Sequence, residues 1–171
     1  MHAESRYHFE YPDDVPEVTY RYSQEIFQFC THIAQVLVDC ETGQVTVERL
    51  IAVHDAGKMI NPGGVYGQIE GGCAQGIGYA LTEELVVQEG LTQNASLENY
   101  VIPMALDIPE LEMSVLEIPE PSGTPLGAKG IAESPIIPTA PAIRNAIFDA
   151  IGKPLYQLPM NAERVLAALN G

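Results

Sequence analysis

The sequence predicts a mixed α+β fold, in which an antiparallel hairpin and short strands pack against a glycine-rich helix and two C-terminal helices. Three observations predict it. Residues 26–39 and 44–53 are rich in β-branched and aromatic side chains and flank a short turn. Residues 65–85 place apolar side chains near helical spacing. Two further segments, 139–151 and 162–169, show the pattern of amphipathic helices.

The size and composition are those of one globular unit. The chain has 171 residues, of which 46% are hydrophobic and 18% are charged. Domains commonly hold about 100–200 residues, so a single domain is expected. Residues 1–17 are polar, contain Pro12 and Pro16 and show no clear period. We therefore predict an irregular lead-in over residues 1–17 and one folded unit over residues 18–171.

The hairpin and the helix that follows it are predicted from turn residues and glycines. In the turn at residues 41–43, Gly43 is free to take a positive φ. Residues 61–64, with their proline and two glycines, are expected to end the second strand. The helix expected over 65–85 has five interior glycines. Each costs about 1 kcal/mol relative to alanine, so another backbone or a ligand is expected to approach that helix closely.

Short strands are expected over residues 84–118. A turn at Glu89 and Gly90 separates two of them, and residues 111–118 alternate polar and apolar side chains. The proline-containing stretch 119–125 is then a loop.

Capping residues delimit the two C-terminal helices. Pro141 fits the first turn of the helix over 139–151, and Gly152 fits its C-terminal cap. Asn161 is the expected N-cap of the helix over 162–169.

Composition argues against several classes of partner. The formal net charge is −15 and no Lys/Arg-rich run occurs, which disfavours nucleic acid and anionic membrane surfaces. The acidity instead favours solubility or contact with a basic partner. Neither a signal peptide nor an apolar stretch of about 18 residues is found. The three cysteines form neither a CxxC pair nor a disulfide framework. A cytoplasmic protein without its own iron–sulfur or zinc site is expected.

Glu133 is the candidate for acid–base chemistry. It lies among small and apolar residues, and an apolar environment raises the pKa of a carboxyl group because burial disfavours its charged form. Such a carboxylate can act as a general base near neutral pH, although a structural or surface role is the alternative. Lys129, four residues earlier, either stabilises an anion near Glu133 or is a solvated loop charge.

Gln68 and Gln75 are candidates for ligand binding. They lie seven residues apart, about two helical turns, and therefore on one face of the glycine-rich helix. An amide offers both a donor and an acceptor, which suits a ligand rich in heteroatoms. Capping or solvent exposure is the alternative. Neither a P-loop nor a dinucleotide-binding fingerprint accompanies these glycines.

Other polar residues have structural interpretations. His54 and Asp55, at the end of the second strand, are expected to fix a turn by hydrogen bonding, with acid–base work as the alternative. The remaining histidines show no metal-binding spacing. Cys73 is expected to be a thiol in the core.

Five segments, taken together and in order, carry a resemblance. They are residues 54–62 (HDAGKMINP), 67–78 (GQIEGGCAQGIG), 100–103 (YVIP), 127–135 (GAKGIAESP) and 139–146 (TAPAIRNA). This ordered set resembles the C-terminal end of the molybdopterin-binding subunit of molybdenum hydroxylases, the xanthine dehydrogenase and aldehyde oxidase family. Ala132 stands where that family usually has glycine.

The resemblance implies a molybdopterin cofactor, often in its cytosine dinucleotide form, with molybdenum held by the pterin and not by protein side chains. It implies hydroxylation of a purine, N-heterocycle or aldehyde with water as the oxygen source. Glu133 is then the catalytic base. The residues expected to contact the cofactor are Gln68, Gln75, Lys129, Gly130, Ile131 and Ala132.

The same resemblance implies partners. An upstream molybdopterin-binding segment or chain is expected to complete the site and to hold the substrate pocket. Iron–sulfur clusters and FAD are expected on other subunits, which would carry electrons away. The alternative hypothesis is a non-catalytic, truncated cofactor-binding or interaction domain.

Overall fold

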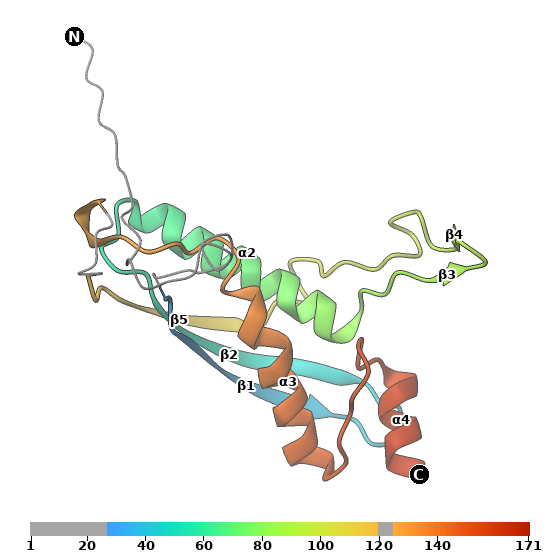
Figure 1. The fold of residues 1–171 in the computed structure, drawn as a ribbon. Coiled ribbons are helices and arrows are strands. Elements are labelled where there is room, and N and C mark those ends of the chain that lie inside the picture. Colours follow the sequence, from blue (N-terminus) through green and yellow to red (C-terminus); the bar gives the residue numbers. More distant parts are fainter. Residues whose placement is uncertain (1–26, 120–124) are drawn as a thin grey trace, which may run out of the picture.

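The computed structural model describes residues 27–119 and 125–171, so the predicted lead-in over 1–17 lies outside the described residues. The order of elements confirms the α+β class (Figure 1). The elements are β1 (Cys30–Val38), β2 (Val45–Asp55), α2 (Pro62–Leu81), β3 (Val87–Gln88), β4 (Leu91–Thr92), β5 (Glu110–Leu116), the 3-10 turn η1 (Pro125–Gly127), α3 (Ile136–Ile151) and α4 (Ala162–Asn170).

A three-stranded sheet with the order β1-β2-β5 forms the base of the fold. The predicted hairpin is confirmed, since β1 and β2 are antiparallel and Gly43 in their turn has a φ of +76°. The strand predicted over 111–118 is also confirmed and pairs parallel to β2. Helix α2 lies within the connection between β2 and β5, as a parallel pair requires a crossover.

The start of α2 differs from the prediction. Residues 61–64, expected only to end a strand, begin the helix: Asn61 is the N-cap and its side-chain oxygen accepts a hydrogen bond from the N–H of Gly64 at 3.1 Å. Pro62 occupies the first helical position, where its missing N–H costs nothing. The helix ends at Leu81 and not at residue 85.

The start of α3 also differs. The helix begins at Ile136, three residues before the predicted start, so Pro141 lies inside it and not in its first turn. Gly152 caps its C-terminus with a φ of +66°, as predicted. Asn161 caps α4 by accepting a hydrogen bond from the N–H of Arg164 at 3.0 Å, which confirms that cap.

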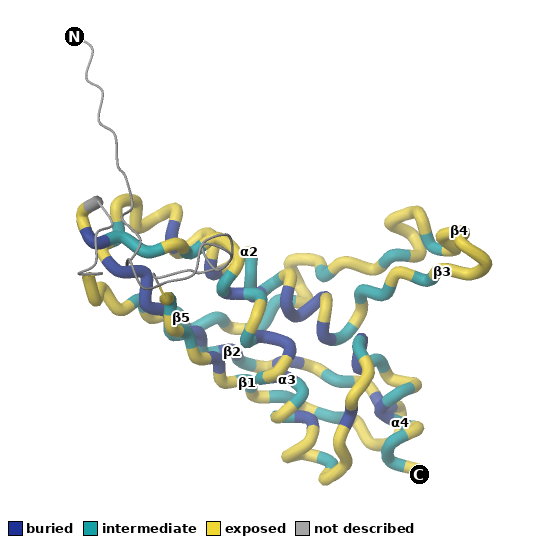
Figure 2. The backbone as a smooth tube through the Cα atoms, viewed as in Figure 1, coloured by how far each residue is buried: buried dark blue, intermediate teal, exposed yellow. Residues whose placement is uncertain are grey.

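The core lies between one face of the sheet and the two helices α2 and α3, which cover that face in Figure 1. Leu50, Ile69, Ile143 and Ile147 are fully buried there. The opposite face of the sheet and the β3–β4 arm, which projects from the body, remain largely exposed (Figure 2). Large apolar side chains are among those exposed, with Leu37 at 59% and Leu91 at 69%.

Candidate functional site

Two segments far apart in the sequence are joined at the base of the Glu133 loop. The N–H of Lys58 donates to the carbonyl of Gly127 at 3.0 Å, and the N–H of Lys129 donates to the carbonyl of Ala56 at 3.0 Å. The motif after β2 and the motif that leads to Glu133 therefore form one structural unit.

Asp55 holds this unit together from the end of β2. Its Oδ1 accepts a hydrogen bond from the N–H of Gly57 at 3.0 Å, which confirms the predicted turn-fixing role. Gly57 has a φ of +57°, and a Cβ there would lie 2.3 Å from the carbonyl oxygen of Gly127, so only glycine fits.

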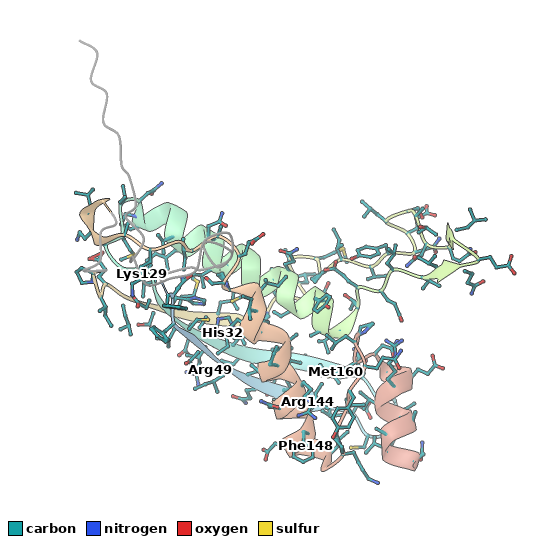
Figure 3. The ribbon with its side chains drawn as sticks, in the orientation of Figure 1. His32, Arg49, Lys129, Arg144, Phe148 and Met160 are labelled. Atoms are coloured by element: carbon teal, nitrogen blue, oxygen red, sulfur yellow. The ribbon has the colours of Figure 1, made fainter. Side chains whose placement is uncertain are left out.

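Asp55 also pairs with Lys129. The Nζ of Lys129 lies 2.5 Å from Oδ2 of Asp55, and the two side chains are only 6% and 5% exposed. The interpretation of Lys129 as a solvated loop charge is therefore wrong. Its ammonium group is engaged by Asp55, and a contribution of Lys129 to cofactor binding stays a prediction. Figure 3 labels Lys129 and His32, which both lie away from α4.

Three of the five interior glycines of α2 lie against other parts of the chain. At Gly78, an added Cβ would lie 2.6 Å from Cδ of Pro103. A Cβ on Gly72 would lie 2.6 Å from Cβ of Pro135, and a Cβ on Gly76 would lie 2.5 Å from Cβ of Thr139. The start of α3 is therefore seated directly on the backbone of α2. This contact confirms the close approach of another backbone that the glycine content predicts.

Two other glycines of α2 remain open. A Cβ on Gly67 or Gly71 would meet no atom of the described residues within 4 Å. Gln68 and Gln75 lie together on the adjoining face of α2, are exposed and hydrogen-bond to none of the described residues. The strip of Gly67 and Gly71 thus offers bare helix backbone beside two free amides, and the helix would be more stable with alanine in place of each glycine.

The 100–103 motif lies beside Gln75. Together with Glu83, Ile102 and Pro103, Gln75 lines an open cavity of about 300 Å³. The hydroxyl of Tyr100 donates to Glu83 at 2.7 Å and so fixes this segment against the end of α2.

The Glu133 loop precedes α3. The carbonyl of Glu133 accepts a hydrogen bond from the N–H of Ile136 at 3.2 Å, while its side chain is exposed. The expectation of a carboxylate enclosed by apolar neighbours is therefore wrong for the described residues.

The backbone before Glu133 offers free donors. The N–H groups of Gly130, Ile131 and Ala132 donate to no acceptor among the described residues. In the part of the chain that the structure describes, a Cβ on Gly130 would have no neighbour within 4 Å. Successive N–H groups without an internal acceptor can together form a binding site for an electronegative ligand.

Sequence reasoning missed a buried polar chain behind the loop. Nδ1 of His32 lies 3.0 Å from Oγ1 of Thr139, and Nε2 of His32 lies 2.8 Å from Nε2 of His54. The hydroxyl of Thr139 donates to the carbonyl of Pro135 at 2.9 Å. The signal in the sequence is that His32 occupies an inward position of the alternating strand β1, where a charged or unpaired ring is not tolerated.

This histidine pair predicts a loss of stability in mild acid. Burial, aided by the neighbouring His54, lowers the pKa of His32 to about 4, and burial lowers the pKa of His54 too. In the unfolded chain histidines titrate near 6.5, so the unfolded state binds more protons between pH 6.5 and 4. The stability from His32 is present above pH 6.5 and decreases by roughly 2 kcal/mol by pH 5.

Urea unfolding at pH 7.5, 6.5 and 5.5 checks this prediction, in a range above the titration of most carboxylates. The variant His32→Gln, which removes the titrating ring, should show a flatter dependence on pH. A wild-type midpoint that does not change over this range would contradict the neutral, buried pair.

The remaining candidates have structural roles. Cys73 is fully buried and burial raises the pKa of its thiol to about 11, which confirms the core thiol. Among the described residues, no group of three or more His, Cys, Asp or Glu side chains could hold a metal ion. None of the described helices combines the length and apolarity needed to cross a membrane.

Comparisons with known proteins agree on one family. The sequence model of the molybdopterin cofactor-binding domain matches residues 1–109. The xanthine dehydrogenase molybdenum-binding subunit of Escherichia coli O157:H7 is 40% identical over 138 residues, covering 80% of this chain and 18% of that protein. The aldehyde oxidoreductase of Megalodesulfovibrio gigas is 39% identical over 145 residues, covering 84% of this chain and 16% of that protein.

A solved structure shares the fold. The crystal structure of quinoline 2-oxidoreductase from Pseudomonas putida 86 has a TM-score of 0.76 and 36% sequence identity, covering 81% of this chain and 18% of that one. The chain thus spans less than a fifth of the length of these three relatives.

Proposed function

The chain belongs to the molybdopterin cofactor-binding domains of the molybdenum hydroxylases, and we propose from this premise that it forms one wall of such an enzyme's cofactor site and supplies its catalytic base, Glu133. One observation carries the proposal. Pro135, at the end of the Glu133 loop, packs on Gly72 of α2, which lies along the helix between Gln68 and Gln75 and next to the open Gly71.

The free polar groups of this wall suit a pterin and its phosphate. The exposed amides of Gln68 and Gln75 can each donate and accept, as pterin ring nitrogens and oxygens require. The N–H groups of residues 130–132 can donate to oxygen atoms, and Gly67 and Gly71 let a flat ring approach the helix backbone. When bound, the molybdenum cofactor supplies the two-electron oxidation of the substrate carbon.

Glu133 has the role of moving a proton. Its carboxylate is positioned to accept a proton from the water that provides the oxygen of the product, and positioned proton transfer contributes about 10²–10⁴-fold in rate. The carbonyl of Glu133 is held by the first turn of α3 and Pro135 is buried against Gly72. The backbone that carries the base is therefore fixed, while the carboxylate stays free to contact a ligand.

The substrate class we propose is an N-heterocycle, purine or aldehyde with an electrophilic carbon. The relatives are named for xanthine, aldehyde and quinoline, which share such a carbon but differ in shape. The cytosine dinucleotide form of the cofactor belongs to the same proposal.

Partner chains are part of the proposal. The exposed apolar side chains on the outer sheet face and on the β3–β4 arm support burial against another polypeptide, because monomers rarely expose large apolar patches. That polypeptide would be the rest of the molybdopterin-binding subunit, with iron–sulfur clusters and FAD on further subunits. The free cysteines support a reducing compartment, the cytoplasm.

Purification of the native assembly that contains this chain tests the proposal. Molybdenum and pterin are expected in it by metal analysis and mass spectrometry, together with an upstream molybdopterin-binding segment. An assembly that contains this chain but neither molybdenum nor pterin would contradict the proposal.

A leucine on the open strip of α2 provides a sharper test. A Cβ added at Gly71 has no atom of the described residues within 4 Å, and Gly71→Leu removes a helix-interior glycine, so the helix should not be weakened. We expect the molybdenum content of the assembly to fall by about tenfold, because an added side chain is not tolerated in a packed contact.

The matched control is Ala150→Leu, at an exposed position of α3, which should leave the molybdenum content unchanged. Mass spectrometry of the purified assembly measures its subunit content. Loss of a partner chain from the Gly71→Leu assembly would show that a polypeptide, and not the cofactor, covers the strip. Wild-type molybdenum and subunit content in Gly71→Leu would rule out both contacts.

A further inference from the structure

A continuous hydrogen-bonded chain runs from the sheet to the Glu133 loop. It starts at His54 on β2, passes through His32 on β1 and Thr139 on α3, and ends at the carbonyl of Pro135, two residues after Glu133. His54 and Thr139 are fully buried and His32 is 9% exposed. The chain therefore connects three elements through groups that water does not reach.

The chain has a defined direction. The carbonyl of Pro135 can only accept, so the hydroxyl proton of Thr139 lies on that bond and Nδ1–H of His32 donates to the hydroxyl oxygen. Nε2 of His32 is then an acceptor and receives Nε2–H of His54. Nδ1 of His54 is left as a bare acceptor, and it has no partner among the described residues.

The opposite direction is less stable. It would put a proton on Nδ1 of His54, which is a buried N–H without an acceptor, and it would leave the carbonyl of Pro135 without the Thr139 hydroxyl. Orphaned buried N–H groups are rarer than acceptors with an unused lone pair. Each ring is therefore neutral with one defined tautomer.

We propose that Thr139, His32 and His54 are positioning residues for Glu133, which hold the backbone of its loop against the sheet through this directed chain. The inference rests on the proposed role of Glu133 as the base. Further contacts hold the same loop, since Sγ of Cys30 lies 4.0 Å from the carbonyl of Ser134 and Pro135 packs on Gly72. The histidine chain adds an anchor near Pro135 that links the loop to both β1 and β2 through side-chain hydrogen bonds of fixed direction.

A pair of Thr139 substitutions tests the proposal in the assembled enzyme. Thr139→Val keeps the shape and the methyl that packs on Gly76 but removes the hydroxyl, whereas Thr139→Ser keeps the hydroxyl. Thr139→Val is expected to lower kcat by about tenfold with KM changed less than about twofold, because a displaced base slows the chemical step more than binding. Thr139→Ser should restore most of that loss. Equal kcat in both variants, whether at the wild-type level or equally lowered, would overturn the proposal.

A second measurement does not depend on activity. With ¹⁵N-labelled histidine, Nδ1 of His32 and Nε2 of His54 should carry the protons in the wild type, and Thr139→Val should shift the His32 signals. A proton on Nδ1 of His54 would overturn the assigned direction. Glu133→Gln separates this inference from the proposed function: full turnover in that variant refutes the base, whereas a loss there with normal Thr139→Val kinetics refutes only the positioning chain.

Discussion

Glu133→Gln is expected to lower the turnover number of the assembled enzyme by about 10²–10⁴-fold. Glutamine has the size of glutamate but cannot accept a proton at neutral pH. The side chain of Glu133 is exposed and makes no hydrogen bond to a described residue, so its exchange should not disturb the fold. Molybdenum and pterin content should therefore stay at the wild-type level while turnover falls.

The control for this variant is Glu163→Gln. Glu163 is exposed in the first turn of α4, where loss of one negative charge changes the net charge equally but lies away from the loop. Turnover and cofactor content should both be unchanged. If Glu133→Gln retained full turnover, Glu133 would not be the base, and a non-catalytic cofactor-binding or interaction domain would be the better hypothesis.

Local patterns were sufficient to predict most elements. Alternation and the Gly43 turn predicted the hairpin, and the caps at Gly152 and Asn161 were found from residue type alone. The two helix starts were misplaced for a shared reason. Prolines stand near both, and a proline marks either the end of one element or the first turn of the next. At Pro62, only the backbone conformation after Asn61 shows whether the proline ends the strand or begins the helix.

Contacts between distant residues could not be predicted in the same way. The glycine content of α2 predicted a close approach, but not that Gly72 and Gly76 receive α3 while Gly67 and Gly71 stay open. His32 and Thr139 form a hydrogen bond although they are 107 residues apart in the sequence. The alternation of β1 shows on which face a histidine lies, yet the partner that fixes its protonation comes from another element.

The exposure of Glu133 could not be predicted either, because it depends on which residues surround the loop in three dimensions. Its apolar sequence neighbours suggested burial, but Ile131 is only partly buried and Ala132 is exposed, so these neighbours do not surround the carboxylate. In helices and strands, fixed spacing rules predict which side chains share a face. In a loop no such rule applies, so residues that are close in sequence need not surround one another. Under the proposed role of Glu133 as the base, other polypeptide would have to supply its environment, which fits the small share of the relatives' length that this chain spans.

The buried pair of Asp55 and Lys129 predicts the largest effect on stability. Asp55→Asn removes the negative charge and leaves the ammonium group of Lys129 buried without it, in a side chain that is only 6% exposed. Removing one partner of a buried ion pair costs about 3–5 kcal/mol. The free energy of unfolding should fall by this amount in urea titrations of the chain, followed by circular dichroism because it has no tryptophan.

The double variant Asp55→Asn/Lys129→Met separates the charge from the geometry. The asparagine oxygen can still accept the hydrogen bond from the N–H of Gly57, and methionine fills the space of the lysine stem without a charge. Replacing a buried ion pair with uncharged side chains of similar volume is often neutral. The double variant should therefore recover most of the stability that Asp55→Asn loses. A loss below about 1 kcal/mol in Asp55→Asn would instead mark the pair as one that contributes little, as solvated pairs do.

The same pair joins the two backbone segments at the foot of the Glu133 loop, because Lys129 also donates its N–H to Ala56. Breaking the pair should thus loosen the base of the Glu133 loop before the hydrophobic core opens. In hydrogen exchange, we expect the N–H groups of Lys58 and Lys129 to lose protection in Asp55→Asn by a larger factor than the N–H groups in the middle of β2. Equal loss at both places would show that the pair stabilises the fold as a whole and has no particular connection to the loop.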